Sequence, residues 1–410
     1  MRLKVNGFTA AREILGISCL SLFVDAVGYG LVVPILPMYV YSLGASDFDL
    51  GLIFSAFAVM QLFTTVPFGL FSDRYGRKPF MVAGMTLLAA SFLYFPFAQS
   101  VPALVVCRAV QGLAASATWS SALALVADTY PGNDKGEKLG ITNGAFAMGS
   151  IAGPLVGGVL GEINFGVPFL AVGFVALAAS VYMLVRLRLP EREAANISIP
   201  YREMLRGALK IRNVLIVVLV YIMVAIFFGF VEPLMPPYLA GRFGLSRTQI
   251  GLFFGVAFLT YAVFQPIVGR LSDRYGRKVF IVYGLVALSL VIPLIPYASS
   301  VLLLLLVVGI AGVFWSLTFT PLMPLVVDSL RSENMETFGT ASGLFNIAYT
   351  IGYSIGPLLG VLITSYYGLE SIFWVFTGML VVMIIATQIL IVEKGTFTKK
   401  YPKEAVKTKE

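Results

Sequence analysis

The chain has 410 residues, of which 58% are hydrophobic and only 12% charged, and its formal net charge is +8. With a mean hydropathy of +0.89, this composition excludes an ordinary soluble globular domain. Apolar runs of about 20 residues or more recur along the chain, and each is long enough to cross the hydrocarbon layer of a bilayer as a helix. The sequence therefore predicts an all-α integral membrane protein.

Twelve apolar segments have the length of a membrane span. We expect these spans at about 13–41, 48–71, 79–97, 101–128, 139–160, 167–188, 212–240, 248–270, 279–297, 300–328, 338–364 and 370–392. The basic residues ahead of the first segment resemble a signal peptide. Because that segment is too long and no small-residue cleavage site follows it, we expect an uncleaved first helix.

The distribution of basic residues predicts how the chain is oriented. All but three of the 29 Lys and Arg residues fall on one side of the membrane if the spans alternate; the exceptions are Arg108, Arg242 and Arg247. Because basic loops remain in the cytoplasm, we expect a multi-pass protein of the cell membrane with both termini cytoplasmic. The positive charge then indicates topology and attraction to membrane lipid, and we expect no nucleic acid as a partner.

A ten-residue segment occurs twice, at 69–78 and at 269–278, with only two differences. Asp128 and Asp328 continue the similarity at the same spacing of 200 residues. An internal repeat of this length predicts two copies of one six-span unit, an arrangement typical of carriers in which one half moves against the other. We therefore expect an N-terminal six-helix bundle at 1–188, a cytoplasmic linker at 189–211, a C-terminal six-helix bundle at 212–392 and a cytoplasmic tail at 393–410.

The repeated segment, Gly-x-x-Ser-Asp-Arg-x-Gly-Arg-Lys between spans two and three, resembles the signature loop of the major facilitator superfamily. The resemblance implies the major facilitator fold, twelve transmembrane helices in two six-helix bundles. In that family such a charge cluster holds the cytoplasmic side shut. We expect this cytoplasmic gate to comprise Asp73, Arg77, Asp128, Asp273, Arg277 and Asp328. The alternative is that the charges only enforce the topology.

Span five contains a glycine-proline motif made of Gly149, Gly153, Pro154, Gly157 and Gly158. Glycines spaced by four residues form a smooth face for helix packing, and a proline bends a helix. The motif resembles that of the drug:proton antiporter group with twelve spans, which includes Gram-positive multidrug exporters and vesicular monoamine transporters. A second copy in span eleven is weaker, because Val361 replaces its last glycine. A generic packing face is the alternative reading.

Two acidic residues lie within apolar runs: Asp25 in span one and Glu232 in span seven. An intramembrane carboxylate is a functional hypothesis by default, and because the chain has no His, carboxylates must carry any proton chemistry. Arg108 lies in a part of span four that resembles the superfamily's second motif, which is associated with proton coupling. We expect these three residues to couple protons to substrate. Two alternatives stay open: Arg108 only bridges backbone carbonyls, or Glu232 lies near the outer surface. We expect Glu162 to be solvated in an outer loop.

Polar and aromatic residues of the spans form the predicted substrate-binding set: Asp25, Tyr29, Gln61, Trp119, Phe227, Glu232, Tyr261, Gln265, Trp315, Asn346 and Tyr349. Aromatic faces beside a carboxylate suit a lipophilic cation. The first and eleventh spans resemble the vesicular monoamine transporters, in which a cationic amine is associated with carboxylates in spans one and seven. Three charged positions of that group are occupied here by Phe57, Ser316 and Asn346, so strict monoamine specificity does not follow.

The sequence predicts a proton-coupled antiporter that exports lipophilic, cationic drugs or amines by alternating access. The alternative is a proton-coupled exporter of a neutral or anionic metabolite such as a sugar. Because no nucleophile–base pair or phosphate-binding loop occurs, we expect no enzyme activity. We expect a monomer with no metal site and no cofactor, driven by the proton gradient.

Overall fold

The computed structural model describes residues 8–130, 134–187, 189, 201–335 and 338–391. Within these residues all regular structure is helical, and twelve helices are long and apolar enough to cross a membrane. The prediction of an all-α membrane protein with twelve spans is confirmed.

The first six spans are formed by helices in one half of the chain: α1 (Phe8–Ser42), α2 (Asp47–Tyr75), α3 (Arg77–Tyr94) with η1 (Phe95–Phe97), α4 (Val101–Thr129), α5 (Asp134–Ile163) and α6 (Gly166–Arg186). A short amphipathic helix follows, α7 (Tyr201–Leu209). The second six spans are α8 (Arg212–Phe243), α9 (Arg247–Tyr275), α10 (Arg277–Val291) with η2 (Ile292–Tyr297), α11 (Val301–Phe319) with α12 (Leu322–Ser332), α13 (Phe338–Tyr367) and α14 (Ser371–Leu390).

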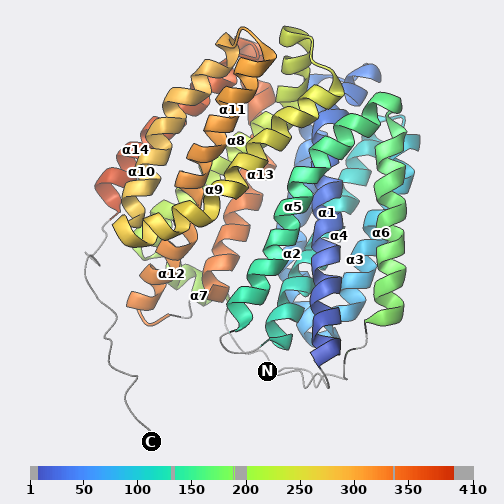
Figure 1. Cartoon of the computed structure of the whole chain (residues 1–410), viewed down its shortest axis with the longest axis vertical. Helices are drawn as coiled ribbons and strands as arrows, with labels where there is room; N and C mark the ends of the chain where they lie inside the picture. The colour runs from blue at the N-terminus through green and yellow to red at the C-terminus, as the bar shows by residue number, and fades with distance from the viewer. Residues whose placement is uncertain (1–7, 131–133, 188, 190–200, 336–337, 392–410) are drawn as a thin grey trace, which may run out of the picture.

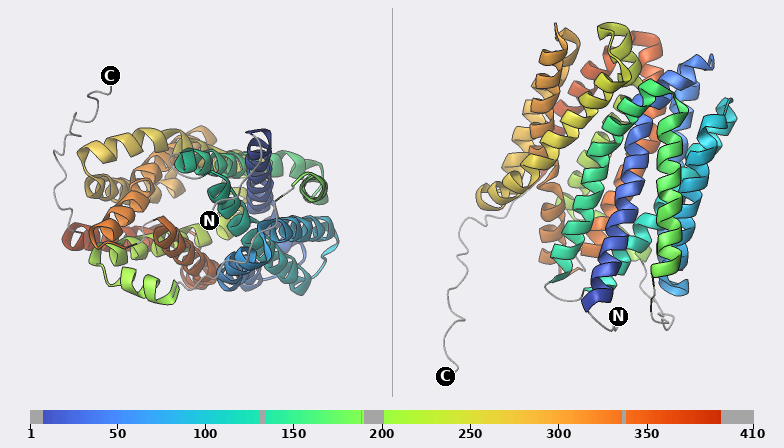
Figure 2. Two further views of the ribbon diagram at one scale, coloured as in Figure 1. Left: turned by 90° about the horizontal axis from the view of Figure 1, so that it is seen from below. Right: turned by 45° about the vertical axis from the view of Figure 1, so that its right-hand side comes forward.

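The helices form two bundles that lie side by side (Figures 1 and 2). Helices α1–α6 enclose one hydrophobic core, and α8–α14 enclose a second. In each bundle the first span packs against the fifth, α1 on α5 and α8 on α13, and the bundles meet chiefly where α5 contacts α9 and α2 contacts α13. We call the end of the molecule with the α2–α3 and α9–α10 turns the terminal face, because α1 also begins there. The opposite end is the far face.

The repeated residues build the same turns in both bundles. Ser46 and Ser246 each cap the helix that follows, accepting a hydrogen bond from a backbone N–H three residues on. Such a cap satisfies one of the free donors at a helix start. Gly76 and Gly276 join consecutive spans at the terminal face with φ of 95° and 102°, a conformation that is costly for residues with a side chain. The internal repeat therefore corresponds to a repeat of structure.

The tenth span departs from the single helix predicted at 300–328. It is divided into α11 and α12 by a turn at Thr320 and Pro321, because proline lacks the N–H that would continue the helix. The equivalent span of the first bundle, α4, is continuous. The two bundles are thus alike in order but not in detail.

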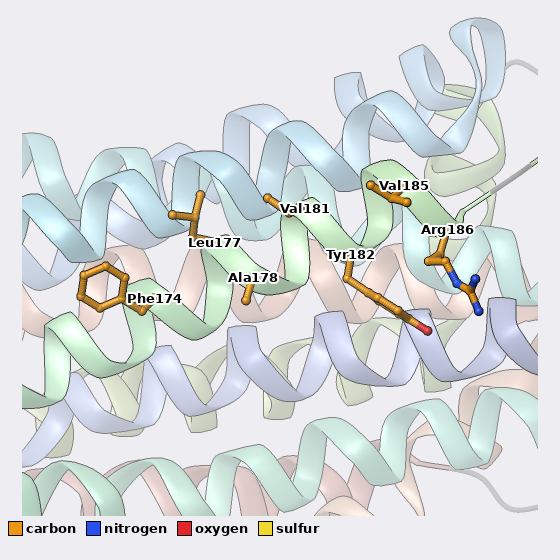
Figure 3. A pocket seen from close by; sticks show the side chains of 7 residues that line it. All are labelled: Phe174, Leu177, Ala178, Val181, Tyr182, Val185 and Arg186. Carbon is orange, nitrogen blue, oxygen red and sulfur yellow. The ribbon is translucent and has the colours of Figure 1, made fainter.

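The outer surface of α6 is apolar. Figure 3 shows side chains of Phe174, Val181 and Val185 standing along this helix around a shallow hollow, and each is more than half exposed. A surface of this kind is too apolar for water but suits the acyl chains of lipid. The hollow is lined by no acidic side chain and by one basic residue, Arg186.

Candidate functional site

A cavity of about 1310 Å³ lies between the two bundles. Its lining includes Lys135, an exposed residue in the first turn of α5 at the terminal face. All eleven residues predicted to bind substrate line this one cavity. The structure thus brings together side chains that are spread over more than 300 residues of sequence, from Asp25 to Tyr349.

The two walls of the cavity differ in chemistry. The wall formed by the first bundle mixes polar groups, including Gln61, Ser116 and Asn143, with apolar side chains around Trp119. The wall formed by the second bundle is rich in aromatic residues, which are Tyr221, Phe227, Phe228, Phe253, Phe254, Phe258, Tyr261, Trp315, Phe319, Phe345 and Tyr349. Ring centroids of Phe227 and Phe228 lie 5.4 and 5.3 Å from that of Trp315. Such a cavity can hold a bulky apolar molecule that also carries polar groups.

Asp25 lies on the cavity side of α1 and is 6% exposed. Tyr29 follows it by four residues, so both side chains project from one face of the helix. Among the residues that the structure describes, Asp25 has no hydrogen bond and no ion pair, whereas Tyr29 is bonded across the cavity. A nearly buried carboxylate without a protein partner is free to take a proton or a cation.

Glu232 on α8 accepts hydrogen bonds from two tyrosines. The hydroxyl of Tyr29 donates from the first bundle at 2.6 Å, and that of Tyr353 on α13 donates from within the second bundle. Glu232 is 3% exposed and lines the cavity. Glu232 therefore belongs to the cavity wall, where three helices enclose it, and is not exposed at an outer surface.

Tyr353 is absent from the predicted set although it contacts Glu232. It is fully buried behind the cavity lining, and its ring stacks on that of Tyr349 with centroids 5.6 Å apart. Tyr353 follows Tyr349, which is in the predicted set, by four residues. Residues at this spacing share a face of a helix, so the sequence could have indicated Tyr353 as well.

Arg108 on α4 is 1% exposed and does not line the cavity. Its guanidinium donates to Gln111 at 2.8 Å and lies 4.6 Å from the centre of the Phe57 ring, which forms part of the cavity wall. No hydrogen bond joins Arg108 to a backbone carbonyl within the described residues, which contradicts the bridging alternative. Arg108 interacts electrostatically with Glu232 from behind this wall.

The glycine-proline motif closes the far-face side of the cavity. A Cβ on Gly153 would lie 2.8 Å from Gly30 of α1, so only glycine permits this contact. Gly158 instead faces the other bundle, where a Cβ would lie 2.6 Å from the carbonyl of Arg247 on α9. The carbonyl of Pro154 lies against Gly251 of the same helix. One motif thus joins α5 both to its own bundle and to the opposite one.

Polar contacts reinforce this closure at the far face. Arg247 donates to the carbonyl of Gly161, and the backbone N–H of Thr248 donates to Glu162 at 3.1 Å. The expectation that Glu162 is merely solvated is therefore wrong. The reason is that α9 begins beside it, and the first N–H groups of a helix have no partner within the helix.

The six predicted gate residues form two charge clusters at the terminal face. Arg77 pairs with Asp73 and with Asp128, the latter at 3.3 Å, and donates to Ser72 at 2.7 Å. In the second cluster Arg277 pairs with Asp328 and, at 3.1 Å, with Asp273. Both predicted pairings of arginine with a distant aspartate occur. Each of these pairs, all within the described part of the chain, joins helices of a single bundle.

Comparison with known proteins places the chain in a family. The model of the Major Facilitator Superfamily matches residues 18–231 and again 217–409. Multidrug resistance protein 1 of Bacillus subtilis is 27% identical over 344 residues, 83% of this chain and 87% of that protein. A probable vesicular acetylcholine transporter of Danio rerio is 25% identical over 377 residues, 85% of this chain and 73% of that protein.

A solved structure shows the same fold. It is a bacterial homologue of the human lysosomal transporter Spinster in an inward-facing, unoccupied conformation, with a TM-score of 0.81 and 14% identity over 94% of this chain and 98% of that one. The resemblance found in the sequence motifs is confirmed, with similarity to multidrug exporters and to a vesicular transporter. The chain belongs to the major facilitator superfamily of membrane transporters.

Proposed function

We propose that the protein is a proton-coupled antiporter of the cell membrane that exports lipophilic cations, with its terminal face toward the cytoplasm. The observation that carries this proposal is Asp25, a nearly buried carboxylate on the wall of a large aromatic cavity, for which the described part of the chain provides no hydrogen bond or ion pair. A carboxylate in such a place takes either a proton or a cation. Competition between the two for one site makes the proton and the cation bind in alternation, as antiport requires.

The walls of the cavity favour a cation with an aromatic or otherwise apolar body. Phe227 and Trp315 offer ring faces to such a body, and a ring face also attracts a positive charge by about 0.5–2 kcal/mol. Asp25 stands on the opposite wall, where the charged nitrogen of the substrate would be neutralised. Similarity to a multidrug resistance protein of Bacillus subtilis is consistent with this class of substrate.

Alternating access follows from the way in which the bundles meet. The far face is closed by contacts of Gly158 and Pro154 with α9, whereas the cavity extends to Lys135 at the terminal face. This is the conformation in which a substrate enters from the cytoplasm. In the opposite conformation the clusters around Arg77 and Arg277 would close the terminal face, as the family resemblance implies.

Flux measured in liposomes tests the proposal. Purified protein is reconstituted with a pH-sensitive dye inside, and ethidium or tetraphenylphosphonium is added across a proton gradient. We expect the cation to drive proton movement, and we expect Asp25→Asn to lower the coupled flux at least about tenfold, since the amide cannot exchange the proton. Coupled flux that persists in Asp25→Asn would contradict the proposal.

A second panel tests the alternative substrate class. Lys135 at the mouth of the cavity is positively charged and would favour an anionic solute. Sugars and organic anions are therefore tested beside the lipophilic cations. Proton movement with those solutes alone would replace cation export by export of a neutral or anionic metabolite.

A further inference from the structure

Glu232 is held by one hydroxyl from each bundle. Tyr353 belongs to the same bundle as Glu232 and fixes the position of the carboxylate, whereas Tyr29 reaches it from the other bundle. We propose that Tyr29 makes Glu232 a reversible link between the two halves, formed when the carboxylate is ionised and the cavity is empty, and released when a proton or a cation occupies the carboxylate.

The link lies in the layer of the molecule that closes the far face. Gly30, the residue after Tyr29, contacts Pro154 of α5, and the carbonyl of Pro154 touches Gly251 in the other bundle. On the second bundle, Gly229 lies one helical turn before Glu232 and contacts Gly356 of α13. Both partners of the link are therefore anchored by close helix packing. A hydrogen bond of 2.6 Å cannot survive a separation on the order of 1 Å, so opening of the far face breaks it.

The charge state of Glu232 sets the strength of the link. Groups that interact with its carboxylate are Tyr29 on α1, Arg108 on α4, and Tyr349 and Tyr353 on α13. A hydroxyl bonds an ionised carboxylate roughly twice as strongly as a neutral acceptor. High pH, at which Glu232 is ionised, therefore strengthens the link and favours the closed far face. Protonation of Glu232 at low pH weakens the link. A cation bound at Glu232 competes with Tyr29 in the same way.

The link would stabilise the empty transporter in the conformation with a closed far face. With Glu232 ionised and no substrate present, the far face stays closed, so the protein does not return to the outward-open state unloaded. This use of the link in coupling rests on the proposed function. The link itself rests only on the contacts of Glu232 and can be tested without any substrate.

Spin-label distances across the far face test the link. Labels are placed at Phe97→Cys and Tyr297→Cys, exposed equivalent positions in the two bundles, in a Cys19→Ser, Cys107→Ala background. The protein is studied in nanodiscs without substrate at about pH 8 and at about pH 5, because the strength of the link depends on whether the Glu232 carboxylate is protonated. We expect a short distance at high pH and a larger open fraction at low pH. Tyr29→Phe should raise the open-to-closed ratio about tenfold at high pH.

Two further variants separate the link from a general packing effect. Glu232→Gln should raise the open fraction and abolish its dependence on pH, and Tyr29→Phe should add nothing in that background. Tyr39→Phe is the matched control: it lies on the same helix, but its hydroxyl donates to the Ala98 carbonyl at 3.1 Å within one bundle. It should leave the distances unchanged.

Unchanged distances in both Tyr29→Phe and Glu232→Gln would overturn the proposal. So would a pH response that persists in Glu232→Gln but disappears in Asp25→Asn, because the proton would then act at Asp25. These outcomes are independent of the flux assay. The link can hold even if lipophilic cations move no protons, and it can fail while they do.

Discussion

Two interfaces between the bundles, which we call the α5–α9 seam and the α2–α13 seam, close the far face. The internal repeat makes them equivalent in position, but their contacts differ in chemistry. Where α5 meets α9, Gly158 lets the start of α9 approach, and Arg247 and Glu162 add hydrogen bonds between the bundles. Where α2 meets α13, Val361 occupies the position equivalent to Gly158 and packs against Gly51. One seam is close and polar, and the other is filled by an apolar side chain.

This difference shows that a duplicated fold need not have duplicated energetics. A seam that depends on glycine has no room for adjustment, because any side chain displaces a backbone. A seam filled by valine can respond through side-chain movement. We therefore expect the α5–α9 seam to control the far face and the α2–α13 seam to tolerate substitution.

Replacing Gly158 by valine, the residue at the equivalent position 361, should have the largest effect on the opening of the far face. In Gly158→Val the new Cβ would lie 2.6 Å from the Arg247 carbonyl and 3.1 Å from the Thr248 Cα. We expect the open-to-closed ratio of the far face to rise up to about a hundredfold, the upper range for overpacking a close contact. The labels at positions 97 and 297 measure it. Val361→Gly leaves a small void instead and should change the ratio less than about tenfold; equal effects would contradict the comparison.

Adding one methyl group to each seam should give a smaller contrast. In Gly251→Ala the methyl group would collide with the Pro154 carbonyl, whereas in Gly51→Ala it would lie 3.2 Å from the Pro357 carbonyl. We expect Gly251→Ala to raise the open-to-closed ratio about tenfold and Gly51→Ala about twofold. The same label pair reports both. A larger effect of Gly51→Ala would place control in the α2–α13 seam.

The charge clusters extend the contrast between the halves to the terminal face. Arg77 is 6% exposed, whereas in the second cluster Asp273 and Asp328 are 62% and 55% exposed. Truncating Arg77 to Ala removes the cation beside Asp73 and Asp128, whose side chains are only 24% and 18% exposed, and should lower the free energy of unfolding by ~1–3 kcal/mol. Arg277→Ala should lower it by less than ~1 kcal/mol, as for exposed ion pairs. Thermal unfolding in detergent measures the loss of stability in each variant. High salt should reduce the loss caused by Arg277→Ala but not the loss caused by Arg77→Ala.

Loss of the polar contact at the start of α9 should give the smallest effect. Glu162→Gln keeps an acceptor for the Thr248 N–H but removes the charge beside the helix N-terminus, an interaction of about 0.3–1 kcal/mol. We expect a rise of about two- to fivefold in the open fraction of the far face. Asp47→Asn, at the start of α2, is the control and should have no effect, because in the structure Asp47 accepts a bond from Tyr41 of its own bundle. A similar rise in the control would indicate a general charge effect.

Much of the fold could be predicted from the sequence because lipid allows few solutions. Backbone groups in hydrocarbon must be bonded within a helix, so long apolar runs indicate spans directly. The break at Pro321 was missed because apolar composition continues through it while the helical hydrogen bonds do not. The cavity residues could be chosen because polar groups within apolar runs are costly unless they face a cavity.

The chemistry that depends on neighbours could not be predicted. Nothing in the linear order indicates that Tyr29 and Tyr353 converge on Glu232, or that Glu162 meets the first turn of α9. Amino-acid order by itself determined that this protein spans the membrane twelve times as a duplicated carrier, because apolar runs and an internal repeat can be read along the chain without knowing which residues touch. Tertiary structure alone decided which carboxylate is engaged and which is free, and which of two equivalent seams is polar, because each depends on residues brought together from different helices.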